Sequence, residues 1–166
     1  MKHLALFVLI MISTTSFAQK IVSGSLSSLK GESILNVEVD YSEAMIHGMG
    51  EADFAVVEQD WYVDKPEIIS YIIEYMQDEL GNKISVGKTS GANYTLVVLP
   101  QSIRRKGDTI SRAILKDKDG NELCEIDKIE AEGGTFGTKL NLIKDGAKET
   151  GTVLGKYLKK QLKKLK

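Results

Sequence analysis

The sequence contains few of the residues on which most catalytic and metal sites depend. Its 166 residues include one cysteine, two prolines, two histidines and one tryptophan. A single cysteine, Cys124, excludes an internal disulfide bond, so packing must stabilise the fold. His47 is the only histidine beyond the first three residues, which leaves too few nitrogen and sulfur ligands for an ordinary zinc site. We therefore predict no metal site, no cofactor and no set of catalytic residues.

An excess of charge of one sign is also missing. The chain has 22 lysines and arginines against 23 aspartates and glutamates, which gives a formal net charge of −1. This near-neutral total provides little attraction to a phosphate backbone, so nucleic acid is not expected as a partner. No long low-complexity stretch argues for disorder, and the length suits one folded domain.

The longest apolar run lies at the beginning of the chain, over residues 4–12. A helix needs about 20 apolar residues to cross a bilayer, and this run is far shorter. Small side chains follow up to the boundary between Ala18 and Gln19. The pattern is typical of a signal peptide over residues 1–18 that is cleaved at this boundary. We expect an exported protein in the periplasm, at the outer membrane or outside the cell.

The rest of the chain predicts a single α/β domain over residues 34–166, preceded by a segment rich in serine and glycine at 19–33. We interpret this segment as a leader that is either flexible or runs along an edge. Polar and apolar residues alternate from Ile34 to Tyr41, which is the period of a half-buried strand. The pattern over residues 42–62 does not decide between strand and helix.

The segment from Asp64 to Leu80 predicts a helix. Asp64 is placed to cap its first N–H groups, with Glu67 as the reciprocal partner and Pro66 in the first turn. Gly81 follows as a stop signal. The expected core face consists of apolar residues at helical spacing, namely Ile69, Ile72, Ile73, Met76 and Leu80.

Four strands and a second helix are predicted after this point. A short strand lies at 84–86, and the run from Tyr94 to Leu99 is apolar on both faces, which predicts an interior strand covered on both sides. Two more strands flank the turn at 117–121, which we interpret as a solvated hairpin rather than a calcium loop. From Leu140 onward, apolar residues form a helical stripe up to the C-terminus.

Together these elements predict a mixed α/β fold of the α+β type. We expect a largely antiparallel mixed sheet of about five strands. One mid-chain helix and one long C-terminal helix would pack on this sheet.

A glycine-rich loop at 133–139 joins the last predicted strand to the last helix. Backbone N–H groups at such a position can hold an anion, although the spacing before the lysine is not that of a nucleotide-binding loop. The alternative is a tight turn that lets the helix approach the sheet. The candidate ligand-binding residues are Gly133, Gly134, Thr135, Gly137 and Lys139.

The C-terminal helix combines small residues with lysines. Glycines four residues apart allow another backbone to approach closely, and we expect them to pack on the sheet or on a second copy of the chain. Lysines near the end of a helix complement its dipole, and they also fit an anionic lipid or glycolipid surface. The candidate interaction surface comprises Gly151, Gly155, Lys156, Lys159, Lys160 and Lys163.

Several motifs in the second half of the chain resemble a known group of proteins. The motifs are YTLVV at 94–98, GGTFGTKLNL at 133–142, DG at 145–146 and GTVLGK at 151–156. With them the chain resembles small secreted proteins of Gram-negative bacteria. The arrangement is also similar to the domain shared by the curli-export lipoprotein and the N-terminal part of TolB-type proteins, although the lipid-bearing cysteine is missing. The second resemblance implies an envelope-associated role in binding or assembly, and neither carries over catalytic residues.

The sequence therefore predicts an exported, non-catalytic cell-envelope protein that binds a protein partner or assembles with itself. Two alternatives stay open. One is a secreted hydrolase-type enzyme with a site near His47 and the 133–137 loop. The other is peripheral binding to anionic lipid or glycolipid through the basic C-terminal helix.

Overall fold

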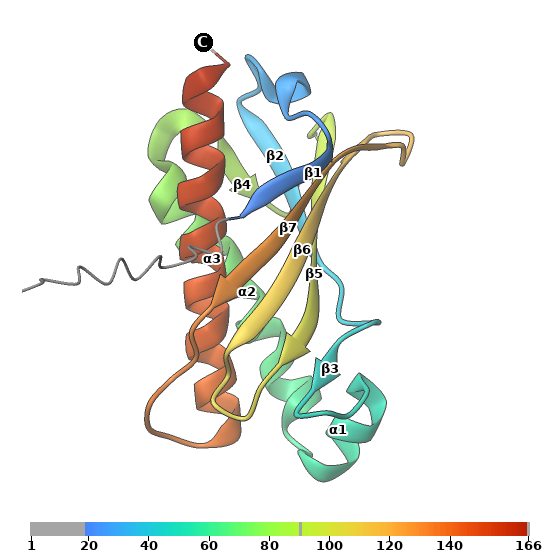
Figure 1. Ribbon diagram of the computed structural model, residues 1–166, viewed down its shortest axis with the longest axis vertical. Coiled ribbons are helices and arrows are strands. Elements are labelled where there is room, and N and C mark those ends of the chain that lie inside the picture. The colour runs from blue at the N-terminus through green and yellow to red at the C-terminus, as the bar shows by residue number, and fades with distance from the viewer. Residues whose placement is uncertain (1–18, 90, 166) are drawn as a thin grey trace, which may run out of the picture.

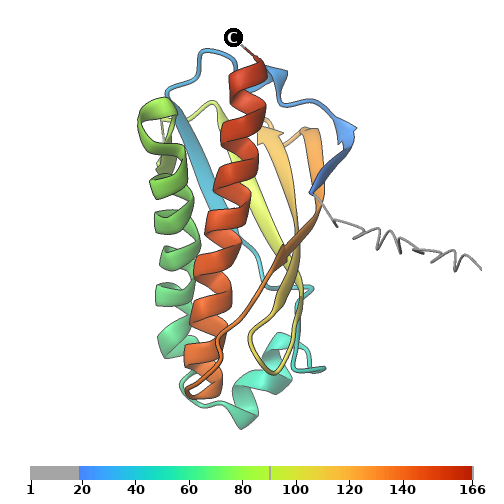
Figure 2. The ribbon, with the colours of Figure 1, turned by 60° about the vertical axis from the view of Figure 1, so that its left-hand side comes forward.

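The computed structural model describes residues 19–89 and 91–165, so the predicted signal peptide, including Ala18, lies outside the described residues. A seven-stranded sheet forms one layer, and helices α2 and α3 lie side by side on one of its faces (Figure 1, Figure 2). The elements are, in chain order, β1 (Lys20–Gly24), β2 (Ile34–Val39), β3 (Met45–Ile46), α1 (Glu51–Val57), α2 (Trp61–Leu80), β4 (Ser85–Gly87), β5 (Tyr94–Ile103), β6 (Thr109–Asp117), β7 (Glu122–Ala131) and α3 (Lys139–Lys164).

The strands are arranged in the order β1-β7-β6-β5-β2-β4, and β3 also pairs with β5. Strands β1, β7, β6 and β5 are joined by antiparallel ladders, whereas β2 and β3 join β5, and β4 joins β2, by parallel ladders. This confirms the predicted mixed α/β fold with its mixed sheet and long C-terminal helix. The sheet is larger than predicted because β1 and β3 are too short to show an alternating pattern. It is less antiparallel because β2, β3 and β4 all pair in parallel.

One face of the sheet forms the core with α2 and α3, and the other face carries no helix in the described part of the chain (Figure 2). Leu96 and Val98 of β5 are fully buried beneath the helices. On the opposite face Val97 is half-buried, whereas Leu99 is 9% exposed. Strand β5 thus lies inside the sheet as predicted, but none of the described helices covers its second face. Charged side chains pair on this opposite face, for example Arg112 with Glu125 at 3.3 Å.

Helix α2 begins at Trp61, three residues before the predicted start. The Trp61 ring is fully buried, and its Nε1 atom donates a hydrogen bond to Oε1 of Glu51 in α1 at 2.9 Å. This anchoring explains the earlier start. Asp64 lies inside the first turn and Asp60 is the N-cap residue, so the predicted capping role of Asp64 is wrong. Gly81 ends the helix as predicted, with φ at 58°.

The two segments that the sequence left undecided both join the domain. Within residues 19–33, β1 pairs with β7 at the edge of the sheet, and Leu26 and Leu29 are 3% and 2% exposed. This segment therefore runs along the edge, which was one of its two predicted forms. The region 42–62 contains both a short strand, β3, and a helix, α1, before α2 begins.

Close contact between α2 and α3 depends on two buried glycines of α3. A Cβ atom at Gly151 would meet the Ile72 carbonyl oxygen of α2, and one at Gly155 would lie 2.9 Å from the Met76 carbonyl oxygen. Any larger residue would force the two backbones apart. The prediction that Gly151 and Gly155 form an interaction surface is therefore corrected, because α2 of the same chain occupies it.

Charged side chains join the same helices near their first turns. Lys144 of α3 pairs with Asp64 and Glu67 of α2, and the Tyr71 hydroxyl donates a hydrogen bond to Glu67. The hydrogen bonds from Lys144 and then Tyr71 lower the pKa of Glu67, and the bond to Glu67 raises the pKa of Lys144. These groups hold α2 and α3 parallel to each other.

Replacing Gly151 by alanine is expected to lower the free energy of unfolding by about 2 kcal/mol or more, because the new methyl group overpacks the contact with α2. On an exposed helix face the same change raises stability by about 1 kcal/mol, so the sign of the effect is decisive. Gly87→Ala is the control, since its Cβ meets nothing within 4 Å. Urea unfolding measures both variants, and a stabilised Gly151→Ala protein would contradict the close contact.

The contribution of Lys144 to stability is expected to depend on pH. The pKa of Glu67 is lowered in the folded protein, so its carboxylate stabilises the fold above the ordinary pKa of glutamate. This contribution is lost as the pH falls through the lowered pKa. The small destabilisation caused by Lys144→Met at neutral pH should therefore shrink in strong acid. Thermal unfolding of the unchanged protein and of the variant measures this destabilisation at each pH. A destabilisation that does not change with pH would refute the stabilising role of the ion pair between Lys144 and Glu67.

Candidate functional site

The glycine-rich loop before α3 serves close packing in the structure. The Gly133 N–H group donates a hydrogen bond to Oδ1 of Asp108 at 3.0 Å, and a Cβ atom at Gly133 would collide with the backbone of the β5–β6 hairpin. Gly107 of that hairpin lies equally close to the α3 backbone at Leu142. The loop, the hairpin and the first turn of α3 thus approach each other through glycines, which supports the packing interpretation.

Only part of the predicted ligand-binding set comes together. Gly133, Gly134 and Thr135 line an open hollow of about 860 Å³ beside the ends of β6 and β7. Gly137 instead packs over Asn141, and the Lys139 ammonium pairs with Oε2 of Glu58 at 3.1 Å. Anion binding at this loop stays a prediction.

The charges around the hollow do not favour an anion. The carboxylates of Asp108, Glu130 and Glu132 line it together with the basic side chains of Arg104 and Lys106. The Asp108 carboxylate already accepts the loop N–H bond described above, and Thr138 caps the helix by accepting from the Asn141 N–H group at 3.3 Å. Two N–H donors at this site, those of Gly133 and Asn141, are therefore in use within the protein.

His47 lies in the turn between β3 and α1, and it does not line the hollow at the glycine-rich loop. Its ring packs edge to face against Phe54, with ring centroids 5.1 Å apart, and its Nε2 atom is buried without a hydrogen-bond partner. Burial lowers the pKa of His47, which favours the neutral ring. The geometry thus gives the hydrolase alternative no shared site between His47 and the 133–137 loop.

The remaining candidate residues for chemistry are used within the fold. Asp117 accepts hydrogen bonds from the N–H groups of Asp119 and Asn121, both at 2.9 Å, which completes the predicted hairpin turn. Cys124 is 2% exposed, and burial raises the pKa of its thiol, so it is a packing residue rather than a nucleophile. Within residues 19–89 and 91–165, no group of His, Cys, Asp and Glu side chains could hold a metal ion.

Four of the exposed apolar side chains of the described residues lie close together in the sequence, where α1 is followed by α2. Val56, Val57, Tyr62 and Val63 are 76%, 56%, 59% and 74% exposed, and we call these four residues the apolar corner. Figure 2 shows that α1 and the first turns of α2 and α3 lie at the same end of the molecule. The sequence did not predict this corner, because three of its four residues lie within 42–62, where the pattern does not decide between strand and helix.

The apolar corner is attached to a rigid base. Phe54 and Trp61, one on each helix, are fully buried and pack edge to face with ring centroids 5.3 Å apart. Glu51 accepts a hydrogen bond from Trp61 and pairs with Lys65 of α2. The turn between the helices is further joined to the start of α3 by Lys139. The exposed valines are therefore held in fixed positions.

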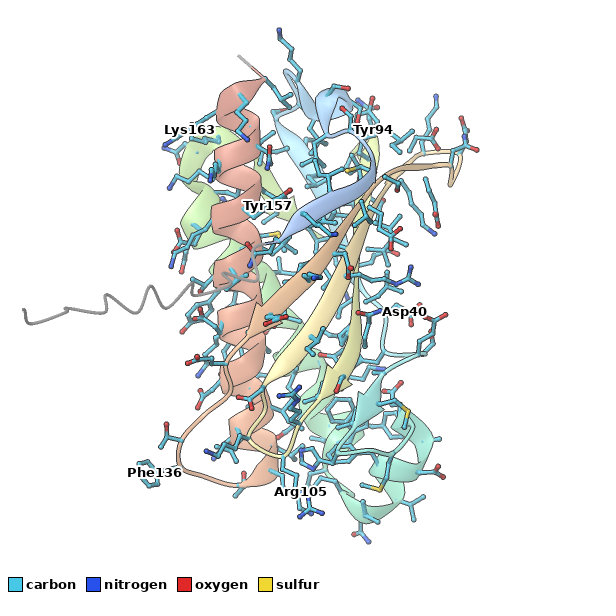
Figure 3. All side chains as sticks on the ribbon, in the orientation of Figure 1. Asp40, Tyr94, Arg105, Phe136, Tyr157 and Lys163 are labelled. Carbon is cyan, nitrogen blue, oxygen red and sulfur yellow. The ribbon has the colours of Figure 1, made fainter. Side chains whose placement is uncertain are left out.

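Charged and aromatic residues surround the corner at this end of the molecule. Phe136, at the tip of the glycine-rich loop, is 89% exposed. Arg105, in an exposed basic run at 104–106, lies at the same end as Phe136 (Figure 3). Asp53 and Asp60 are exposed on α1 and before α2. This end thus carries an apolar centre with both signs of charge around it.

The lysines of α3 divide into two sets. Lys156, Lys160 and Lys164 line a groove of about 580 Å³ between α3 and β1, opposite Lys20 of β1. We call these four residues and their surroundings the lysine groove. Lys159 and Lys163 are not among the residues that line it.

The apolar stripe of α3 faces the domain core. Leu154 and Leu158 are 0% and 1% exposed, so the helix does not present these leucines to a lipid bilayer. None of the helices in the described part of the chain is long and apolar enough to span a membrane.

Comparison with known proteins identifies no family. No protein-family model matches the chain, and no curated protein is significantly similar to it. Among solved structures, the chain is similar to the PelC dodecamer from Paraburkholderia phytofirmans, with a TM-score of 0.44 and 12% identity over 84% of this chain and 97% of that chain. A second crystal structure, of a point variant of the same PelC, gives a TM-score of 0.39 and 14% identity over the same shares. At these values the similarity assigns neither a family nor a function.

Proposed function

We propose that the chain is an exported, non-catalytic cell-envelope protein that acts by binding another protein, and that a second copy of the chain is the first partner to test. The observation that carries this proposal is the apolar corner, whose four side chains are all more than half exposed. Apolar side chains gathered on a surface mark interaction sites, because water is displaced from them when a partner binds.

The rigidity of the corner supports this role. Buried Phe54 and Trp61 fix both helices beneath it, and Glu51 and Lys65 join the helices across the turn. A surface that is already ordered loses little conformational entropy on binding. The corner therefore has the properties of a preformed protein interface.

The charges around the corner favour a second copy as its occupant. Asp53 and Asp60 flank it, while Arg105 and its basic neighbours lie at the same end of the molecule (Figure 3). When two such ends meet about a two-fold axis, the acidic side of one copy can face the basic side of the other. Acidic and basic side chains are thus both available at this end for pairing between two copies.

Other surfaces offer less to a protein partner. The helix-free face of the sheet carries Arg112 paired with both Glu43 and Glu125. Edge strand β1 is interrupted by a bulge between Ile21 and Ser23, and edge strand β4 spans three residues. Short or bulged edges discourage the addition of a further strand.

Sedimentation of the chain beginning at Gln19, over a wide range of concentrations, tests self-association. The double variant Val56→Ser, Val63→Ser is expected to weaken association at least tenfold, since a buried valine contributes about 1.5 kcal/mol or more. Val22→Ser, which removes a valine that is 45% exposed on β1, is the matched control and should leave association unchanged. A double variant that associates as the unchanged chain does would contradict a role for the corner.

Photocross-linking in intact cells distinguishes a second copy from another partner. A benzoylphenylalanine at Tyr62 is expected to cross-link to a second copy, whereas one at Tyr75, which is 36% exposed on the same helix, should not. A cross-link from position 62 to a different protein would keep the corner as the site and change its occupant. If position 62 yields no cross-link, the proposed role of the corner is wrong.

Export rests on the sequence pattern at residues 1–18 and on the resemblance to small secreted proteins. The protein isolated from fractionated cells is expected to begin at Gln19 and to be absent from the cytosol. Sequencing of its N-terminus, together with cytosolic and periplasmic marker enzymes, measures both. A cytosolic protein that begins at Met1 would contradict export without affecting the test of the corner.

A further inference from the structure

The lysine groove is a second binding surface, on a different part of the molecule from the apolar corner. We propose that it binds the anionic headgroup of a membrane lipid and thereby holds the protein on a membrane surface. This goes beyond the proposed protein contact and stands on separate residues. It also changes the earlier expectation for the basic helix, because strand β1 takes part and only some of the lysines do.

The groove places four cationic side chains around one hollow. Lys156, Lys160 and Lys164 follow each other at intervals of four residues, which puts them on one side of α3. Lys20 lies across the groove on β1, and all four lysines are exposed. Two elements far apart in the sequence thus direct positive charge to the same place.

No carboxylate that lines the groove neutralises this positive charge, although Lys156 pairs with Glu79 beside it. In the part of the chain that the structure describes, the residues lining the groove include no aspartate and no glutamate. Lys156 lies 3.7 Å from Oε1 of Glu79, outside the groove, and Lys164 donates a hydrogen bond to the Gln161 side chain. The hollow at the glycine-rich loop, by contrast, contains three carboxylates. The groove is the better site for a phosphate group.

The floor of the groove is apolar. Ile21 of β1 and Val153 and Tyr157 of α3 form it, and all three are half-buried. The Tyr157 hydroxyl contacts the Ile21 main chain and the Gln161 side chain, and the first contact joins α3 to β1. Lysines at the rim and carbon atoms at the floor match a lipid headgroup, whose phosphate adjoins glycerol and acyl carbons. An acidic polypeptide would satisfy the lysines but not the floor.

The position of the groove is compatible with protein binding at the other end. Lys163 and Tyr157 lie toward one end of α3, whereas Phe136 and Arg105 lie at the opposite end of the molecule (Figure 3). Because Leu154 and Leu158 are buried in the core, α3 binds at the level of the headgroups and does not insert. A protein held in this way leaves the apolar corner exposed to its partner.

Flotation with lipid vesicles tests the proposal, using the chain that begins at Gln19. The chain is expected to bind vesicles of phosphatidylglycerol and phosphatidylcholine at low salt and to bind pure phosphatidylcholine at least tenfold more weakly. Lys160→Gln, Lys164→Gln should weaken binding about 30-fold, since each lysine near an anionic surface contributes about fivefold. Lys20→Gln alone should weaken it several-fold.

The matched control is Lys159→Gln, Lys163→Gln, which removes the same charge from the same helix outside the groove. It should retain binding within about threefold. Equal losses in the two double variants would mean attraction to surface charge in general and would overturn the proposal. The proposal would also be overturned if the chain bound anionic and neutral vesicles equally well, or if it bound neither type of vesicle. Lysine-dependent capture of soluble polyglutamate without vesicle binding would overturn it as well. Circular dichroism confirms that each variant is folded.

Discussion

Two long helices share one face of the sheet because α3 has glycine where the backbone of α2 passes. Gly151 and Gly155 bring α3 against the carbonyl groups of Ile72 and Met76, and Lys144 joins the first turns of both helices. If a larger residue held the helices further apart, they would not cover the core strands together. No described helix then covers the opposite side of the sheet, which carries charged pairs such as those of Arg112 with Glu43 and Glu125.

The positions of the two candidate surfaces follow from this arrangement. The parallel helices place the first turns of α2 and α3 at one end, where buried Trp61 holds α1 against α2 and turns the apolar corner outward. The opposite half of α3 runs beside the edge strand β1 and forms the lysine groove with it. Burial of the leucines of α3 leaves its lysines as the part of the helix available for binding. The same packing thus orders the core and exposes the surfaces.

Periodicity was enough to predict the main elements but not their ends or partners. Alternation identified β2, and apolar stripes identified α2 and α3, because burial on one face imposes these periods. The beginning of α2 was predicted wrongly, because Trp61 and Glu51 fix it through a contact between two helices. Strands β1 and β3 were missed because short edge segments carry almost no pattern.

The candidate surfaces were harder to predict than the fold. The lysines at positions 156 and 160 could be named from the sequence, but their separation from Lys159 and Lys163 depends on where β1 lies. The glycines of α3 could be identified as sites of close approach, but their partner is α2 rather than the sheet or a second copy of the chain. Three of the four residues of the apolar corner, Val56, Val57 and Tyr62, lie in the segment whose secondary structure could not be predicted. Tertiary contacts therefore decide which exposed residues act together.

The claim that the apolar corner is a protein interface can be tested directly by amide hydrogen exchange of the chain at low and high concentration. Association through the corner predicts slower exchange at high concentration in residues 51–63, with the helix-free face of the sheet and the lysine groove unchanged. Protection that appears on the sheet face instead, or association with no change at 51–63, would contradict this account.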